Sequence, residues 1–179
     1  VTITNAGLLD IAPGADMDLD GAFLQNGTGS VSTAGDITTS GDDITFSTAV
    51  TLTDGHAVSL STGNGGGDIA FLSTLDGTTD FAEDLTLTSG TGDITFTGAV
   101  GAITDLGAIE ITSANDVTFS VALSADSLVQ NAGTGDTQFD GPVVINSSAA
   151  AGLAITTQTV TINDTITTNN EGTVTITNA

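Results

Sequence analysis

DITFTGAVGAITDLGAIEITSAN, residues Asp93 to Asn115, contains two short runs in which apolar and polar residues alternate. The runs are Ile94-Thr95-Phe96-Thr97 and Ile109-Glu110-Ile111-Thr112, and small or turn-forming residues surround both. Alternation with a period of two predicts β-strands, whereas flanking glycine, alanine, serine and asparagine are typical of turns. The stretch is therefore expected to form two strands and two turns.

The same pattern recurs along most of the chain. Its clearest mark is an aspartate followed three residues later by a phenylalanine. The pairs are Asp20/Phe23, Asp43/Phe46, Asp68/Phe71, Asp93/Phe96, Asp116/Phe119 and Asp136/Phe139. Successive phenylalanines of these pairs are 23, 25, 25, 23 and 20 residues apart, and every phenylalanine except Phe81 takes part. A repeat of this length with no helical period inside it predicts a solenoid.

A single repeat of about 23 residues is too small to bury its own apolar face. If the repeats stack with parallel strands ~4.8 Å apart, each repeat covers the next and each backbone amide finds a partner. Equivalent residues then form columns, and the phenylalanines are expected to form one of them. The predicted fold class is therefore all-β, a parallel β-helix (β-solenoid) with coils of roughly 20–25 residues.

Apolar residues two positions apart share one face of a strand, so pairs of them predict the core-facing strands. From Asp43 onward, each pair around a phenylalanine is followed by a second pair. The predicted partners are Ile44/Phe46 with Val58/Leu60, Ile69/Phe71 with Leu85/Leu87, Ile94/Phe96 with Ile109/Ile111, Val117/Phe119 with Leu128, Phe139 with Leu153/Ile155, and Val160/Ile162 with Val174/Ile176. The register of residues 7–42 is left open, and the longest excursion, Leu75 to Asp84, is expected to accommodate Phe81.

Glycine-rich corners separate these strands. Examples are Gly65-Gly66-Gly67, Gly90-Thr91-Gly92 and Gly133-Thr134-Gly135. Glycine adopts positive φ angles without a steric penalty, so the corners are expected to supply the positive-φ positions of sharp turns.

The composition predicts a folded chain and excludes some classes of binding partner. The 179 residues are 39% hydrophobic with a mean hydropathy of +0.28, which predicts a packed core rather than disorder. Lysine and arginine are absent, and the formal charge is −22. Nucleic acid and anionic membrane surfaces are excluded as direct partners, because both require basic side chains. An acidic chain attracts cations, divalent ones above all. Extreme halophily is an alternative, although 12% charged residues is a modest acidic load for it.

Cysteine is absent, which removes disulfides and thiolate metal sites. The sequence shows no signal peptide and no apolar run of transmembrane length, so membrane insertion is not expected. These features favour a piece of a larger secreted protein. The expected location is extracellular, either secreted or attached to a cell surface.

The two ends of the chain share a hexapeptide. Val1-Thr2-Ile3-Thr4-Asn5-Ala6 is repeated letter for letter as Val174-Thr175-Ile176-Thr177-Asn178-Ala179. The difference between Val174 and Val1 predicts a long-range repeat of 173 residues; chance recurrence of a low-complexity string is the alternative. Residues 1–179 are therefore expected to form a single β-solenoid segment, one unit of a longer tandem array.

Several segments of the sequence resemble a known class of repeats. GDITFTGAV (Gly92–Val100), LTLTSGTG (Leu85–Gly92) and VTITNA (Val174–Ala179) look like the repeats of giant bacterial secreted or surface proteins of the filamentous-haemagglutinin-like adhesin type. The resemblance covers essentially the whole chain. It implies a right-handed parallel β-helix used as a stalk, fibre or adhesive rod, and it carries over no catalytic residue.

Aspartates at equivalent points of the repeats are the main candidate site. Stacking places like charges about 5 Å apart, which costs near 1 kcal/mol per neighbour in water. Two hypotheses relieve this repulsion: each aspartate accepts a backbone N–H in its turn and faces water, or the column binds Ca²⁺. The candidate metal ligands of the column are Asp43, Asp68, Asp93, Asp116 and Asp136.

A second candidate metal site lies near the N-terminus. Asp16, Asp18 and Asp20 have the spacing that opens an EF-hand loop. However, Gly27 occupies the position of the bidentate glutamate, and the apolar residues between the aspartates alternate as in a strand. Bound Ca²⁺ is possible here, but no cofactor is required.

Other chemistry has little support in the sequence. His56 is the single histidine and is expected in a solvent-facing turn. Without lysine, arginine or cysteine no nucleophilic triad or phosphate clamp is evident, so no catalytic residue is expected. Paired carboxylates alone hydrolyse glycosides, but the acidic residues here recur instead of gathering once. Thr-x-Thr pairs suggest an ice-binding face, but Glu110, Val129 and Ala154 break the threonine columns.

The sequence thus favours a structural segment of an extracellular bacterial fibre or adhesin that is not an enzyme. The expected partners are further copies, head to tail along the rod axis, and a glycan or cell-surface receptor. The alternative is a module that binds Ca²⁺ or a glycan on the same scaffold. A polysaccharide-acting enzyme and an ice-binding protein are the less favoured functions.

Overall fold

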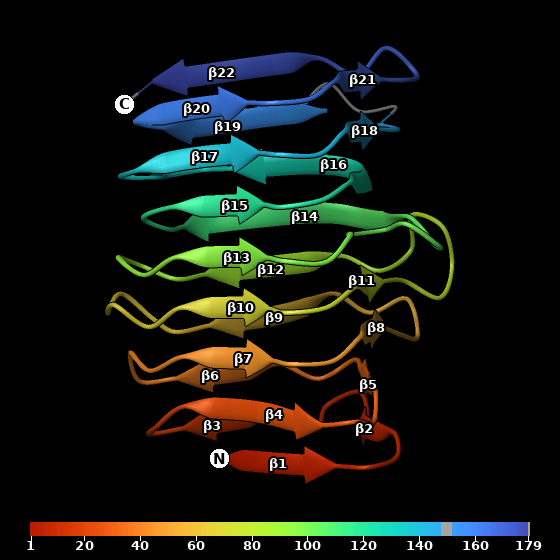
Figure 1. Ribbon diagram of the computed structural model, residues 1–179, viewed down its shortest axis with the longest axis vertical. Coiled ribbons are helices and arrows are strands. Elements are labelled where there is room, and N and C mark those ends of the chain that lie inside the picture. The colour runs from red at the N-terminus through yellow and green to blue at the C-terminus, as the bar shows by residue number, and fades with distance from the viewer. Residues whose placement is uncertain (148–151, 179) are drawn as a thin grey trace.

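The chain winds into a β-solenoid of eight coils, one for each strand of its eight-stranded sheet (Figure 1). The computed structural model describes residues 1–147 and 152–178, and this part of the chain contains strands and turns but no helix. Every pairing between these strands is parallel. The predicted fold class is confirmed.

The front sheet contains one strand from every coil. Its strands, in order, are β1 (Thr2–Asn5), β4 (Phe23–Gly27), β7 (Ile44–Phe46), β10 (Ile69–Phe71), β13 (Ile94–Phe96), β15 (Val117–Phe119), β17 (Asp136–Phe139) and β20 (Thr159–Ile162). Coil lengths follow from the pairing. Thr118 pairs with Gln138, a step of 20 residues, and Ala70 pairs with Thr95, a step of 25. These steps agree with the predicted range.

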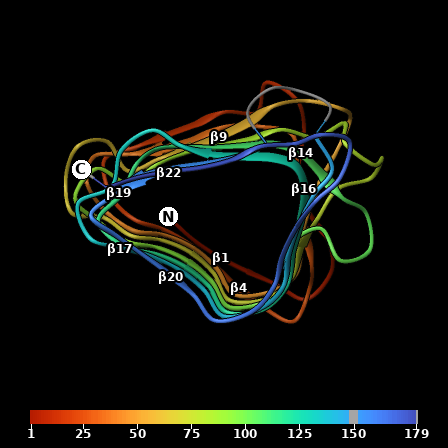
Figure 2. The same ribbon diagram turned by 90° about the horizontal axis from the view of Figure 1, so that it is seen from above.

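The back sheet lies opposite the front sheet (Figure 2). Its strands are β3 (Met17–Leu19), β6 (Ile37–Thr39), β9 (Val58–Ser61), β12 (Leu85–Thr88), β14 (Leu106–Ser113), β16 (Leu123–Gln130), β19 (Leu153–Thr157) and β22 (Val174–Asn178). All six predicted partner sets place their first member on the front sheet and their second on the back sheet.

A third, short sheet joins the other two along one side, and the sequence prediction of two strands per repeat missed it. Its strands are β2 (Leu9–Ile11), β5 (Val31–Thr33), β8 (Val50–Leu52), β11 (Leu75–Asp76), β18 (Val143–Ile145) and β21 (Ile166–Thr168), with single bridges at Val100 and the first residues of β16 completing it. The segments are only two or three residues long, too short to display a clear alternation.

The coil is right-handed. In Figure 1 the front strands point to the right and the back strands point to the left behind them, while the chain climbs from the red N-terminus to the blue C-terminus. Figure 2, seen from above, shows the coils superimposed around a common three-sided outline.

Five phenylalanines form a column inside the front sheet: Phe46, Phe71, Phe96, Phe119 and Phe139. We call this set the phenylalanine column. Neighbouring ring centroids are 4.5 to 5.4 Å apart, and the ring planes are within 13° of parallel. All five are buried, and each fully buried side chain of this size contributes roughly 1.5–3 kcal/mol.

The predicted sixth member, Phe23, is not in this column. Phe23 pairs with Ile44, and Gln25 lies beneath Phe46. The Phe23 ring still contacts Phe46, at 5.3 Å between centroids, but is tilted by 52°. The Asp20/Phe23 pair is therefore out of register with the other pairs, because the first coils are shorter than the spacing assumed; Leu24 and Thr45 are only 21 residues apart.

The glycine corners work differently from the prediction. Of the three corners named, only Gly90 has a positive φ angle, 61°. Gly67 and Gly92 are needed for close approach between coils: a Cβ atom on Gly92 would be 2.1 Å from the Gly67 carbonyl oxygen, and one on Gly67 would be 2.6 Å from the Asp42 oxygen. Glycine is therefore required there because adjacent coils touch through their backbones.

The repeated hexapeptide occupies two different faces. Its first copy contributes β1, at the edge of the front sheet, and its second contributes β22, at the edge of the back sheet; Ala179 lies outside the described residues. Identical sequence thus forms a strand at non-equivalent points of the coil. The alternation of threonine with valine or isoleucine suits any strand with one covered face.

Candidate functional site

The five repeated aspartates form a ladder along one corner of the rod, just before the front strands. Four of the carboxylates, those of Asp43, Asp68, Asp93 and Asp116, each accept a hydrogen bond from the backbone N–H of the aspartate in the next coil. The N···Oδ1 distances are 2.9 Å for Asp68 to Asp43, 2.8 Å for Asp93 to Asp68, 3.0 Å for Asp116 to Asp93 and 2.7 Å for Asp136 to Asp116. We call this set the aspartate column.

These contacts give the aspartates a structural role. An amide at the start of a strand has no ladder partner of its own, and the carboxylate beneath supplies one. Asn115 Nδ2 adds a bond of 3.0 Å to Asp93, and Thr161 Oγ1 a bond of 3.1 Å to Asp136. Four of the five aspartates thus accept a backbone N–H, as predicted, but the donor belongs to the next coil and not to the aspartate's own turn; Asp136 accepts the Thr161 hydroxyl instead.

The three N-terminal candidates lie apart from the aspartate column. Asp16 and Asp18 flank Met17 on the back sheet, and Asp20 follows the end of β3. All three aspartates are exposed, and Asp16 Oδ1 accepts the Asp36 backbone N–H at 3.0 Å. The segment is an extended strand rather than an EF-hand loop.

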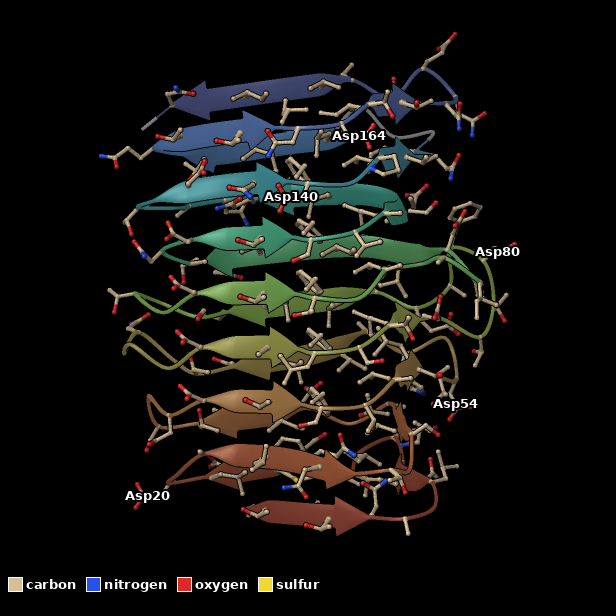
Figure 3. The ribbon with its side chains drawn as sticks, in the orientation of Figure 1. Asp20, Asp54, Asp80, Asp140 and Asp164 are labelled. Atoms are coloured by element: carbon tan, nitrogen blue, oxygen red, sulfur yellow. The ribbon has the colours of Figure 1, made fainter. Side chains whose placement is uncertain are left out.

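A surface hollow lies over β3 and β6. Its lining residues are Asp16, Met17, Asp18, Asp36 and Thr38. Across residues 1–147 and 152–178, no three acidic or histidine side chains gather closely enough to hold a metal ion. Figure 3 shows the dispersal: Asp54 and Asp80 project from one edge of the rod and Asp20 from the opposite edge. Ca²⁺ binding stays a prediction.

A buried carboxylate that sequence reasoning missed organises the longest loop. Glu83 is buried, although most acidic residues of the chain line the surface. Its Oε2 accepts the backbone N–H groups of Thr78 and Thr79, both at 3.1 Å. Its Oε1 accepts the Thr78 hydroxyl at 2.6 Å and the Gly55 N–H of the coil beneath at 3.3 Å. The only sign of this arrangement in the sequence is the length of the Leu75–Asp84 segment, which is the longest connection between predicted strands.

Two opposing effects act on the Glu83 carboxyl. Burial by itself raises its pKa, because desolvation disfavours the charged form. The hydrogen bonds from Thr78, Thr79 and Gly55 favour the carboxylate and outweigh burial, so the pKa of Glu83 lies below its usual value. The folded protein therefore holds Glu83 ionised.

Above Glu83, two loops of neighbouring coils are bonded to each other. Residues 77–84 and 101–105 share the bonds Phe81 N–H to Asp105 O at 3.1 Å and Asp105 N–H to Asp80 Oδ1 at 3.2 Å. Phe81 is 44% exposed and has a φ angle of 64°, and Ile103 is 87% exposed. A positive φ angle is strained for a bulky residue such as Phe81. The hydrogen bonds between the two loops hold Phe81 in this conformation.

The remaining candidates are surface features. His56 is exposed, in a turn where Asp54 and Gly55 both have positive φ angles, as predicted. Glu110, Val129 and Ala154 stack in one outward column of the back sheet, which confirms that the threonine columns are interrupted. Within the described ranges no helix is long and apolar enough to cross a membrane.

Comparison of the chain with protein-family models, with curated proteins and with solved structures found no match.

Proposed function

We propose that this chain is a structural segment of an extracellular bacterial fibre or adhesin, a rod continued along its axis by further solenoid coils. The observation that supports it best is a core column of the side sheet that contains an aliphatic residue in all eight coils. Its members are Leu9, Val31, Val50, Leu75, Val100, Leu123, Val143 and Ile166. Because each coil contacts only its neighbours, a core column that continues through every coil can be extended by further coils of the same kind, as a fibre requires.

The surface fits an extracellular rod. Outward positions of the strands are mainly threonine and serine, and a net charge of −22 opposes lateral aggregation. The resemblance to repeats of secreted bacterial adhesins points the same way.

Electron microscopy of the longer protein that contains this segment tests the proposal. Eight coils at ~4.8 Å per coil give this segment an axial length of about 38 Å, so filaments are expected to lengthen in proportion to the number of such segments. An antibody raised against the loop 77–84 should label the filaments at regular intervals. Compact particles whose ends are closed by other structure would contradict the proposal.

A second candidate function is contact with a glycan or receptor, and the paired loops favour it. Loops 77–84 and 101–105, bonded to each other, carry an exposed aromatic and an exposed aliphatic side chain, and exposed apolar groups of this kind are typical of binding surfaces. Phe81→Ser and Ile103→Ser are expected to abolish binding to any glycan that a glycan array identifies. Val121→Ser, a change at an exposed position outside these loops, is the control, and equal loss in all three variants would reject the loops as the binding surface.

Binding of Ca²⁺ remains the alternative for the aspartates. A melting curve recorded before and after a chelator tests it, since a ligand of the folded state raises the melting temperature. An unchanged curve would remove Ca²⁺ from the proposed roles.

A further inference from the structure

The sequence asparagine–glycine occurs twice in the chain, as Asn26-Gly27 and Asn64-Gly65. This pair is chemically labile, because the backbone nitrogen of the glycine can attack the side-chain amide of the asparagine. Glycine has no Cβ atom that would shield this nitrogen or restrict the backbone around it. The structure places the two pairs in different surroundings, and the difference indicates which of them reacts.

Asn64-Gly65 lies in the turn, residues 62–68, that joins β9 to β10 at the left edge of the rod in Figure 1. Asn64 and Gly65 are both exposed. Across residues 1–147 and 152–178, no protein group forms a hydrogen bond with the Asn64 side chain or with the Gly65 N–H. Gly63, which precedes the pair, has a φ angle of 73°. The amide of Asn64 and the nitrogen that attacks it are therefore not held apart by other contacts.

Asn26-Gly27 lies instead within a paired strand. Asn26 is in β4 and pairs with Thr4 of β1, and the Thr4 hydroxyl donates a hydrogen bond to Asn26 Oδ1. A Cβ atom on Gly27 would be 2.2 Å from the Asn5 carbonyl oxygen, so the Gly27 backbone packs directly on the neighbouring coil. Strand side chains stand out from the sheet, and the ring closure requires β4 to separate locally from β1.

Packing between coils accounts for the glycine of the exposed pair. A Cβ atom on Gly65 would be 2.9 Å from the Gly41 Cα atom of the coil beneath, closer than such atoms approach in proteins. Glycine at position 65 is therefore required by the contact between coils. The lability of Asn64 is a chemical consequence of that contact.

We propose that Asn64 is a site of spontaneous covalent modification, at which the folded chain converts asparagine to aspartate and isoaspartate. The Gly65 nitrogen forms a bond to Asn64 Cγ, the Cγ–Nδ2 bond breaks, and ammonia leaves with the proton of the Gly65 amide. The product is a cyclic imide. Water then opens one of the two bonds between the imide nitrogen and a carbonyl carbon. Opening at Cγ gives aspartate, and opening at the main-chain carbonyl carbon gives isoaspartate.

The modification alters the contact with the coil above. Both products add a negative charge to a net charge of −22, and isoaspartate also lengthens the main chain by one atom between residues 64 and 65. The Gly65 carbonyl accepts the Thr91 N–H at 2.9 Å and the Thr91 hydroxyl at 3.0 Å, and a Cβ atom on Gly90 would be 2.7 Å from Asn64 Cα. The longer main chain displaces the Gly65 carbonyl, so Thr91 is expected to lose both bonds.

Peptide mapping of the folded protein after storage at mildly alkaline pH tests the site. Digestion at acidic pH after leucine and phenylalanine gives peptides 61–71 and 25–46, each with one asparagine. Mass spectrometry detects the replacement of the amide NH₂ by a hydroxyl group. Asn64 is expected to convert at least tenfold faster than Asn26, equivalent to a barrier lower by about 1.4 kcal/mol. Conversion of Asn64 at the rate of Asn26 or slower would overturn the proposal.

The same measurement in urea shows whether the fold directs the reaction. In the unfolded chain both asparagines precede a glycine in a flexible backbone, so the two rates should become similar. A difference as large in urea as in the folded protein would assign the preference to local sequence and overturn the role of the structure. Asn64→Gln, whose longer side chain closes a larger and less favourable ring, is the matched control, and its peptide 61–71 should stay unmodified.

Hydrogen exchange at the Thr91 amide tests the effect on the coil contact. Exchange should be at least tenfold faster in the chromatographic fraction that contains isoaspartate than in freshly prepared protein, because the Thr91 N–H has lost its acceptor. Asn64→Asp carries the added charge without the longer main chain and should leave this exchange unchanged. Unchanged exchange in the isoaspartate fraction, or equal acceleration in Asn64→Asp, would overturn the inferred disruption.

Discussion

Two glutamines occupy core columns that otherwise hold apolar residues, and the surroundings of the two differ. Gln25 lies beneath Phe46 in the front sheet, and Gln130 lies between Ile111 and Ile155 in the back sheet. Both are buried. Gln25 Nε2 donates to Asn5 Oδ1 at 2.6 Å and its Oε1 accepts the Thr48 hydroxyl at 3.2 Å. Within the described part of the chain, Gln130 Nε2 has no hydrogen-bond partner.

The difference shows what a solenoid core tolerates. Gln25 receives partners from the coil beneath and the coil above, so the polar amide is satisfied across three coils. The Thr137 hydroxyl donates to Gln130 Oε1 at 2.7 Å, and the Gln130 amide nitrogen lies against Gly133, which offers it no side-chain acceptor. A buried polar group without a partner costs about 1–3 kcal/mol, whereas a paired one is close to neutral or stabilising. The same residue type is therefore expected to have opposite effects at the two sites.

The largest expected effect comes from emptying an apolar position of the column that holds Gln25. Phe96→Ala removes a buried ring stacked between two others and should lower the free energy of unfolding by about 3–5 kcal/mol, measured by urea denaturation. Phe81→Ala is the matched control, since Phe81 is outside the column and exposed. A loss from Phe96→Ala no greater than that from Phe81→Ala would mean that ring stacking does not hold the coils together.

Glu83 extends the comparison to a buried, fully bonded charge. Glu83→Gln replaces one acceptor oxygen by an amide that faces the donor groups of Thr78 and Thr79, and should destabilise the protein by about 2 kcal/mol at neutral pH. Asp54→Asn, which removes a charge from an exposed neighbouring turn, is the control and should change stability little.

The lowered pKa of Glu83 also predicts a pH effect. Because the pKa of Glu83 is lower in the folded than in the unfolded state, its stabilisation is fully present above the unfolded value, about 4.3, and is lost as pH falls through the folded value. The protection factors of the Thr78 and Thr79 amides, which compare exchange with the rate of an unstructured chain at the same pH, should therefore fall as the solution is acidified through the folded pKa of Glu83. This fall should disappear in Glu83→Gln, and its persistence there would assign it to another group.

Removing the bonded glutamine should have a smaller effect. Gln25→Leu leaves Asn5 Oδ1 without its donor and is expected to destabilise by about 1–2 kcal/mol, because the lost hydrogen bonds outweigh the added apolar contact with Phe46. Urea denaturation measures the change. An increase in stability would show that the amide contacts contribute nothing to folding.

The smallest expected effect has the opposite sign. Gln130→Leu together with Thr137→Val converts an incompletely bonded pair into apolar residues and should stabilise the protein by about 1 kcal/mol. A double-mutant cycle separates the Gln130–Thr137 bond from the gain in packing. Destabilisation by the double variant would indicate that Gln130 has a partner in the folded protein that the structure does not reveal.

Sequence periodicity predicted the front and back strands correctly wherever the two apolar positions of a strand were both large. Ile94/Phe96 and Ile109/Ile111 are such cases, and both form paired strands. The spacing of aspartate and phenylalanine gave a wrong prediction for Phe23. Phe23 follows an aspartate at the usual distance, yet it lies two positions away from the phenylalanine column. Local spacing cannot detect such a shift, because the length of the intervening turns decides the register.

The candidate site was predictable to a similar degree. The repeated aspartates were identified from their spacing, and their acceptance of backbone N–H groups was expected. The donor in the next coil, the burial of Glu83 and the bonding of loops 77–84 and 101–105 were not. Each of these depends on residues that are 20 or more positions apart or on the path of an irregular loop.

The sequence by itself determined that this chain is a stack of coils with an apolar interior, an acidic exterior and no lysine or arginine, because alternation and composition are properties of the chain alone. The tertiary structure decided which residues meet across coils: Gln25 beneath Phe46, each aspartate beneath the next aspartate amide, and one hexapeptide on two faces. The physical reason is that a coil buries its face only against its neighbours, so register is set by the fit between coils and not within any one of them.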